Sequence, residues 1–204
     1  MGYRVETETV RGAMDSNEVL EVLKECGSLL EGHFELRSGL HSNRFFQCAK
    51  VLRYPRVAAR LCDELVRGMS EALPSEVKID GVIAPALGGI VVGHEVARAL
   101  DVKSIFAEKE DDRLVLRRFV IESGENYVVA EDVITRGGRV QETIDIVESN
   151  GGNVVAVALL VDRSGGKASF SCPTFSLLEM EPVTYEPDNC PLCTSGEELV
   201  HPGS

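Results

Sequence analysis

The sequence predicts an α/β protein in which a mostly parallel central sheet is flanked by helices. Between Pro55 and Val161, short apolar segments alternate with amphipathic stretches of helical length, which is the pattern of strands joined by helical crossovers. Helix-ending residues, Pro74 and the pair Gly151-Gly152, stand between these segments. The 204 residues suffice for one such domain with a sizeable core and small extensions.

Two helices and an extended region are predicted before the alternating part. Asp15 and Glu18 have the spacing of a capping box, so a helix is expected from there to about Leu30. Residues 32–51 are mixed and extended. The segment Pro55–Leu73 begins with proline and repeats apolar residues at steps of four, which favours a second helix.

The alternating part supplies the sheet. Its predicted elements are the strand Ile79–Ala84, the helix Ile90–Leu100, the strand Lys103–Glu108, a charged turn leading into the apolar segment Leu114–Ile121, the strand Tyr127–Ala130, a helix reaching Asn150 and the strand Asn153–Val161. Parallel sheets bind ligands beyond the carboxyl ends of their strands. Functional residues are therefore expected in the loops Ala84–Gly89, Glu131–Arg139 and Asp162–Lys167.

Composition excludes several classes of function. The chain has 33 acidic and 21 basic residues, a formal net charge of −12, which disfavours nucleic acid as a partner. The longest apolar run, Val154–Val161, is far too short to span a membrane. With no apolar stretch of signal-peptide length at the N-terminus, we expect a soluble cytoplasmic protein that binds neither nucleic acid nor a membrane.

One segment carries the pattern of a sugar-phosphate site. An apolar strand leads to Glu131-Asp132, followed by Thr135, Gly137-Gly138 and an amphipathic helix. Glycines at a helix start let consecutive backbone amides converge on a phosphate, and the threonine hydroxyl adds a donor. The carboxylates can accept hydrogen bonds from sugar hydroxyls and help to position Mg²⁺. The alternative is an acidic strand end before a Gly-rich helix start, which is common in α/β proteins.

This order of residues matches the motif with which type I phosphoribosyltransferases bind 5-phosphoribosyl 1-diphosphate (PRPP). Four more blocks resemble orotate phosphoribosyltransferases: 32–46, with its Phe-x-Leu-x-Ser-Gly stretch before an aromatic pair, Ala84–Gly89, Val161–Arg163 and the tail from Cys190. The resemblance implies the type I phosphoribosyltransferase fold, with a small N-terminal hood. Residues 1–54 would form the hood segment and first helix, 55–180 the core, and 181–204 a C-terminal extension.

The resemblance also implies a reaction and a set of roles. Orotate and PRPP would give orotidine 5′-monophosphate and diphosphate with Mg²⁺, a pentosyltransferase step of de novo pyrimidine (UMP) biosynthesis, in a homodimer with shared active sites. No protein ligand to the metal is expected, because PRPP would carry it. The residues implied are Glu131, Asp132, Val133, Ile134, Thr135, Arg136, Gly137, Gly138, Arg139, Leu87, Gly88 and Gly89 for PRPP, and Arg37, Phe45, Phe46, Thr135 and Arg163 for orotate.

The catalytic cations depart from the pattern of better-known members. Those members carry several basic residues in a mobile loop, whereas this chain has a short, mostly acidic segment from Glu108 to Arg113. Lys109 matches one loop lysine, and Arg113 is a possible substitute for a second. Together with Asp132 they are the predicted catalytic residues. Arg117 and Arg118 are candidates to compensate for the basic residues that the segment lacks.

Two other functions stay open, and so does the use of one cysteine pair. The rivals are a phosphoribosyltransferase for a purine or another base, and a PRPP-sensing regulator that keeps the fold without catalysis. Cys190 and Cys193 have metal-ligand spacing, but a zinc site needs more ligands, such as Cys172 or His201. We expect packing or an incidental close pair at these two cysteines.

Overall fold

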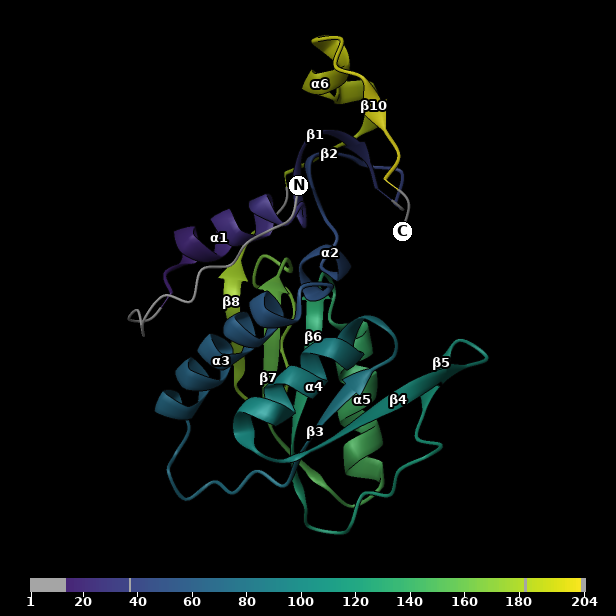
Figure 1. The fold of residues 1–204 in the computed structure, drawn as a ribbon. Coiled ribbons are helices and arrows are strands. Elements are labelled where there is room, and N and C mark those ends of the chain that lie inside the picture. Colours follow the sequence, from purple (N-terminus) through teal and green to yellow (C-terminus); the bar gives the residue numbers. More distant parts are fainter. Residues whose placement is uncertain (1–13, 37, 182, 203–204) are drawn as a thin grey trace.

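The computed structural model describes residues 14–36, 38–181 and 183–202, which form two sheets and the helices around them (Figure 1). The larger sheet has the strand order β5-β4-β3-β6-β7-β8, and every neighbouring pair is parallel except β4 and β5. This confirms the predicted mostly parallel sheet. Its strands are β3 (Gly81–Pro85), β4 (Lys103–Glu110), β5 (Arg113–Val115), β6 (Asn126–Ile134), β7 (Asn153–Asp162) and β8 (Thr174–Glu179).

Helices cover both faces of this sheet because successive strand residues point to opposite sides. Val128 and Ala130 of β6 face the cluster that contains α3 (Pro55–Ala72) and α4 (Gly88–Leu100). Tyr127 and Val129 face the opposite cluster, which contains α5 (Gly138–Ser149). These strand residues are fully buried, as expected for a sheet covered on both faces.

The central strand is longer than predicted. We expected β6 to end at Ala130, but its pairing with β7 continues through Val133, which faces Val161, to Ile134, which faces Asp162. The prediction was wrong because two apolar residues after the carboxylates keep the strand in register with its neighbour. The apolar segment predicted at Leu114–Ile121 is mostly not strand, because β5 covers only Arg113–Val115. Strand β8 was not predicted.

A second, smaller sheet, called the hood sheet here, has the order β10-β1-β2-β9. It joins β1 (Leu29–Glu35) and β2 (His41–Phe46) to two strands from the C-terminal part of the chain, β9 (Thr184–Tyr185) and β10 (Leu199–Val200). Between these last two lie a short 3₁₀ turn, η1 (Pro187–Asn189), and α6 (Pro191–Thr194). Figure 1 shows the hood sheet beyond the carboxyl ends of β7 and β8.

Two helices connect the hood sheet to the core. Helix α1 (Ser16–Glu25) starts with the predicted capping box, in which Asp15 accepts from the backbone amides of Asn17 and Glu18 at 2.8 and 2.9 Å. It ends earlier than the predicted Leu30, because Gly27 adopts a φ of +69° and turns the chain into β1. The short α2 (Ala49–Leu52) follows β2. In the described part of the chain, no helix is long and apolar enough to cross a membrane.

Candidate functional site

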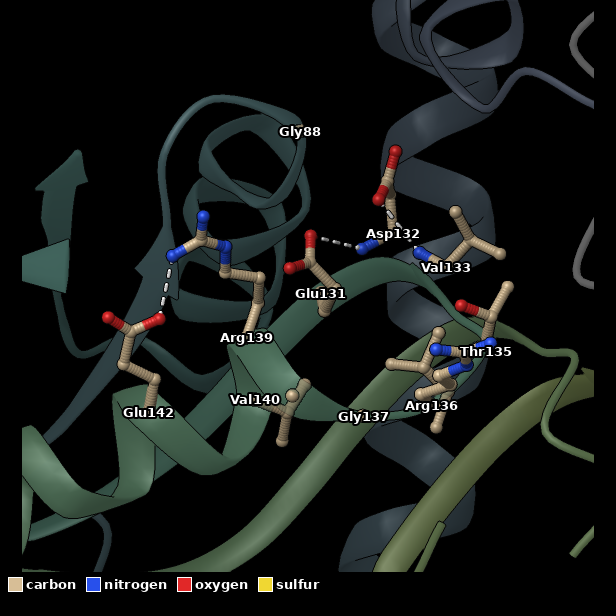
Figure 2. Close-up of a pocket in the computed structure, with 12 residues that line it drawn as sticks. Gly88, Glu131, Asp132, Val133, Thr135, Arg136, Gly137, Arg139, Val140 and Glu142 are labelled. Atoms are coloured by element: carbon tan, nitrogen blue, oxygen red, sulfur yellow. Dashed lines mark hydrogen bonds and ion pairs between the residues drawn. The ribbon is translucent and has the colours of Figure 1, made fainter. Parts of the chain in front are cut away.

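A cavity of about 650 Å³ opens where β6 ends and α5 begins (Figure 2). It is the place that the sequence pattern of strand, carboxylates, threonine and paired glycines indicated. The lining comprises most of the residues predicted to bind PRPP and two that were not predicted: Gly88, Glu131, Asp132, Val133, Ile134, Thr135, Arg136, Gly137, Gly138, Arg139, Val140 and Glu142.

The backbone at the start of α5 has the form expected of a phosphate site. Gly137 is left-handed, with a φ of +73°, and a Cβ atom there would lie 2.7 Å from the Phe170 ring, so glycine is required. No described side chain caps α5. Its first amides are therefore unpaired donors at the positive end of the helix dipole, an arrangement that suits a phosphate.

Two carboxyl groups stand in a largely dry position at one side of the cavity. Glu131 is only 8% exposed, and its Oε1 accepts the backbone amide of Asp132 at 3.1 Å. Asp132 accepts the amide of Val133 at 2.8 Å. Burial, and then the neighbouring Asp132, raise the pKa of Glu131 to about 9, and burial also raises the pKa of Asp132. The pair therefore favours binding a proton, sugar hydroxyls or a cation.

The loop before α4 lies directly against these carboxyl groups. A Cβ atom on Gly88 would lie 3.1 Å from Oδ1 of Asp132, and one on Gly89 would lie 2.9 Å from Oε1 of Glu131. Leu87, next to them, is 83% exposed. A side chain at Gly89 would collide with Glu131 and one at Gly88 would crowd Asp132, so the two glycines let this loop approach the carboxyl groups closely. The residues predicted for diphosphate thus meet those predicted for ribose.

An arginine joins the end of β7 to the hood sheet. The Arg163 guanidinium lies over the Phe46 ring at 5.1 Å, and its backbone amide donates to the carbonyl of Ile134 at 2.9 Å. Its Nε is buried and has no hydrogen-bond partner among the described residues, and burial lowers its pKa. Phe45, by contrast, packs on Phe34 with ring centroids 5.9 Å apart. A buried Nε–H with no partner needs an acceptor, and an anion meets that need best.

The predicted catalytic cations lie on the β4–β5 hairpin. Lys109 pairs with Asp112 at 2.6 Å, and Arg113 begins β5. The hairpin is attached to the start of α5, since Arg139 donates to the carbonyl of Asp112 at 3.1 Å. Among the described residues, the cavity lining includes neither Lys109 nor Arg113.

The other arginines that the sequence indicated for the site differ in their positions. Arg136 and Arg139 line the cavity, and Arg139 also pairs with Glu142 at 2.7 Å. The two candidates to compensate for missing cations, Arg117 and Arg118, pair with acidic residues of β4 instead. The predicted orotate residue Arg37 lies outside the described residues.

Sequence reasoning missed Val140 and Glu142 as lining residues. Helical periodicity holds the signal for Glu142, which lies three residues after Arg139 and therefore on the same face of α5. Cys48 was also missed; its buried thiol donates to the Asp132 carbonyl at 3.8 Å, although it is not among the residues that line the cavity.

Comparison with known proteins places the chain among named relatives. No model of a known protein family matches the chain. Proteins named orotate phosphoribosyltransferase are similar to it: one from Desulforamulus reducens is 48% identical over 94% of this chain and 98% of its own length, and one from Carboxydothermus hydrogenoformans is 47% identical over 92% and 97%.

Solved structures share the fold. The orotate phosphoribosyltransferase from Aeropyrum pernix superposes with a TM-score of 0.61 at 24% identity, covering 79% of this chain and 93% of that one. An adenine phosphoribosyltransferase gives 0.63 at 21%, covering 77% and 99%. These likenesses confirm the type I phosphoribosyltransferase fold. With relatives near 48% identity over almost the whole chain, this protein belongs to the orotate phosphoribosyltransferase family.

Proposed function

We propose that this chain transfers the phosphoribosyl group of PRPP to orotate, giving orotidine 5′-monophosphate and diphosphate. The observation that carries the proposal is the cavity at the end of β6, where buried carboxyl groups, an uncapped glycine-rich helix start and a second glycine loop converge. Family membership supplies the identity of the base. In the reaction, the bond from the anomeric carbon to diphosphate breaks with its electron pair, and a ring nitrogen of orotate forms the new bond and loses its proton.

PRPP fits the cavity in one orientation. Its 5′-phosphate would accept hydrogen bonds from the backbone between Thr135 and Arg139 and from the Thr135 hydroxyl. The ribose hydroxyls would donate to Glu131 and Asp132, which extend toward the cavity from the adjacent strand. The diphosphate would then reach the amides of residues 87–89, which lie against those carboxyl groups. A polyanion bound by amides and arginines suffers less repulsion if the carboxyl pair holds a proton or faces a cation.

The base would lie between the core and the hood sheet. Orotate is a planar anion whose carboxylate matches a guanidinium fork. Arg163 offers a buried, unused Nε donor beside the Phe46 ring. The backbone of Phe45 and Phe46, the Thr135 side chain and Arg37 complete the proposed set, which would hold the ring nitrogen against the anomeric carbon. Positioning of this kind, with charge neutralised on the leaving diphosphate, is the main source of catalysis that the site offers.

Magnesium is part of the proposal. Its preferred ligands are oxygens, and it usually keeps several waters while bound through substrate phosphates. No direct protein ligand is expected, because PRPP would carry the ion, and the two carboxyl groups at the cavity wall would help to position it. When bound with PRPP, the ion would neutralise charge on the diphosphate.

We also propose a homodimer in which Lys109 and Arg113 complete the neighbouring subunit's site. The support is their position on a projecting hairpin and outside the lining of their own cavity. A cytoplasmic location is proposed as well, since both substrates are anions that a bilayer excludes.

The loss of orotate absorbance on adding PRPP and Mg²⁺ tests the activity directly. Orotate, adenine, guanine, xanthine and uracil are compared at equal concentration, and turnover is expected only with orotate. Turnover on a purine alone would refute the assignment of the base. PRPP binding without turnover on any base would instead indicate a sensor.

Subunit complementation tests the shared site. Lys109→Ala is expected to lose most of its turnover. Asp132→Asn should also lose most of its turnover, because Asp132 would hold the ribose hydroxyls. Mixing the two purified variants after dissociation should restore about a quarter of wild-type activity, because half of the dimers would contain one intact site. No recovery in a mixture that forms hybrid dimers would mean that Lys109 serves its own chain or none.

A further inference from the structure

The C-terminal part of the chain brings two cysteines to two histidines of the hood sheet. Cys190 and Cys193, at the start of α6, meet His33 of β1 and His41 of β2. The four ligand atoms all lie within 4.8 Å of one another. We propose that these residues form a structural zinc site that fastens the C-terminal segment to the hood. Neither Cys172 nor His201, the partners considered from sequence, belongs to the cluster.

The distances are close to those of a tetrahedral site. The sulfur of Cys193 lies 3.3 Å from Nδ1 of His41 and 3.6 Å from Nε2 of His33, and the sulfur of Cys190 lies 3.5 Å from the same Nε2. The two histidine nitrogens are 2.9 Å apart. Zinc bonds of about 2.0 Å to nitrogen and about 2.3 Å to sulfur give ligand–ligand edges of about 3.3–3.8 Å. Small shifts of the side chains therefore suffice to hold the ion.

A hydrogen bond outside the cluster sets the tautomer of His33. Its Nδ1 lies 2.9 Å from the carbonyl oxygen of Glu197. A carbonyl can only accept, so Nδ1 carries the proton and Nε2 presents its lone pair to the two sulfurs. This is the second contact that metal-binding histidines commonly make, which fixes the tautomer and the ring plane.

Burial argues against an accidental grouping. His33, His41 and Cys190 are 3%, 5% and 2% exposed, while Cys193 is exposed at the surface. Both cysteines are free, so no disulfide accounts for the grouping. Two thiolates with two imidazoles favour zinc over magnesium or calcium, which prefer oxygen.

The hood sheet has a physical need for such an ion. Strands β9 and β10 have two residues each, too few for backbone pairing alone to hold the tail. A metal bound only by the folded arrangement adds its binding energy to that arrangement. His33 lies near the end of β1 and His41 begins β2, so the ion would hold these two strands together as well.

The test is the zinc content of the full chain, purified with a reductant and dialysed against excess Zn²⁺ and then against buffer. About one zinc per chain is expected for the wild type. Cys193→Ser removes an exposed ligand and should lower the content at least tenfold, whereas Cys172→Ser, a change outside the cluster, should leave it unaltered. Circular dichroism of each variant verifies the fold of the core.

Cobalt provides a second readout that depends on the ligands themselves. Co²⁺ in the wild-type protein should give the intense visible bands of a tetrahedral site and a thiolate charge-transfer band, both reduced by Cys193→Ser and retained by Cys172→Ser. A wild-type protein that retains less than a tenth of an equivalent of zinc overturns the proposal. So does a Cys193→Ser variant with undiminished zinc and cobalt spectra.

Discussion

The protonation of Glu131 leads to a quantitative prediction about stability and pH. Its carboxyl group is buried beside Asp132, and its pKa is raised to about 9, compared with about 4.3 in an unfolded chain. Below the lower value, both states are protonated and the carboxyl costs nothing. As pH rises toward 9, the unfolded chain loses the proton freely and the folded chain does not, so the free energy of unfolding falls.

The Glu131→Gln substitution removes this titration while keeping a side-chain oxygen that can accept the amide of Asp132. Each pH unit between the two pKa values changes stability by about 1.4 kcal/mol. From pH 6 to pH 8, the free energy of unfolding of the variant should therefore rise relative to the wild type by up to about 2.7 kcal/mol. This value is an upper bound, because Asp132 shares part of the effect. For a chain of this length that corresponds to a relative rise in Tm of roughly 5–10 °C.

Thermal unfolding of both proteins at half-unit steps from pH 5.5 to 8.5 measures the difference. Subtracting the two curves cancels every other titrating group. Glu148→Gln, an exposed position at the far end of α5, is the control and should give a flat difference. A flat curve for Glu131→Gln, or one that falls with pH, refutes the reasoning that burial keeps this carboxyl protonated.

Three further predictions concern separate parts of the molecule. Gly89→Ala should lower stability by about 1–3 kcal/mol in urea unfolding, since its Cβ would lie 2.9 Å from a Glu131 oxygen, while Gly68→Ala, in open space on α3, should raise it by up to about 1 kcal/mol; equal effects would contradict the steric argument. Asp15→Ala removes the cap of α1 and should cost about 1 kcal/mol, and an unchanged urea midpoint would show that the cap does not contribute. Arg163→Lys should raise the KM for orotate about tenfold or more with little change for PRPP; a parallel rise in both constants would remove Arg163 from base recognition.

Local patterns predicted the fold and one part of the site well. The capping box at Asp15, the proline that begins α3 and the alternation of strands and helices depend on neighbouring residues, so they can be interpreted without tertiary contacts. The cavity at Thr135–Gly138 was predictable for the same reason: strand, loop and helix start are contiguous, and glycine is demanded by the backbone itself.

What depends on pairing across the chain could not be predicted. The length of β6 is set by its register with β7, and the sequence of Val133 and Ile134 alone does not reveal that partner. The four residues of the cysteine–histidine cluster come from two segments more than 140 residues apart. Spacing identified Cys190 and Cys193 as a pair, but only the closed hood sheet selects His33 and His41 over Cys172 and His201.

The composition of the hood sheet has a consequence for the order in which the chain folds during synthesis. Every strand of the larger sheet ends at or before Glu179, so the core can assemble before the C-terminal residues pair with the hood. The hood must wait, since β1 takes its parallel neighbour from Leu199–Val200, and closing so long a loop is slow. A chain that ends just before β9 should therefore contain a folded core and an incomplete hood sheet.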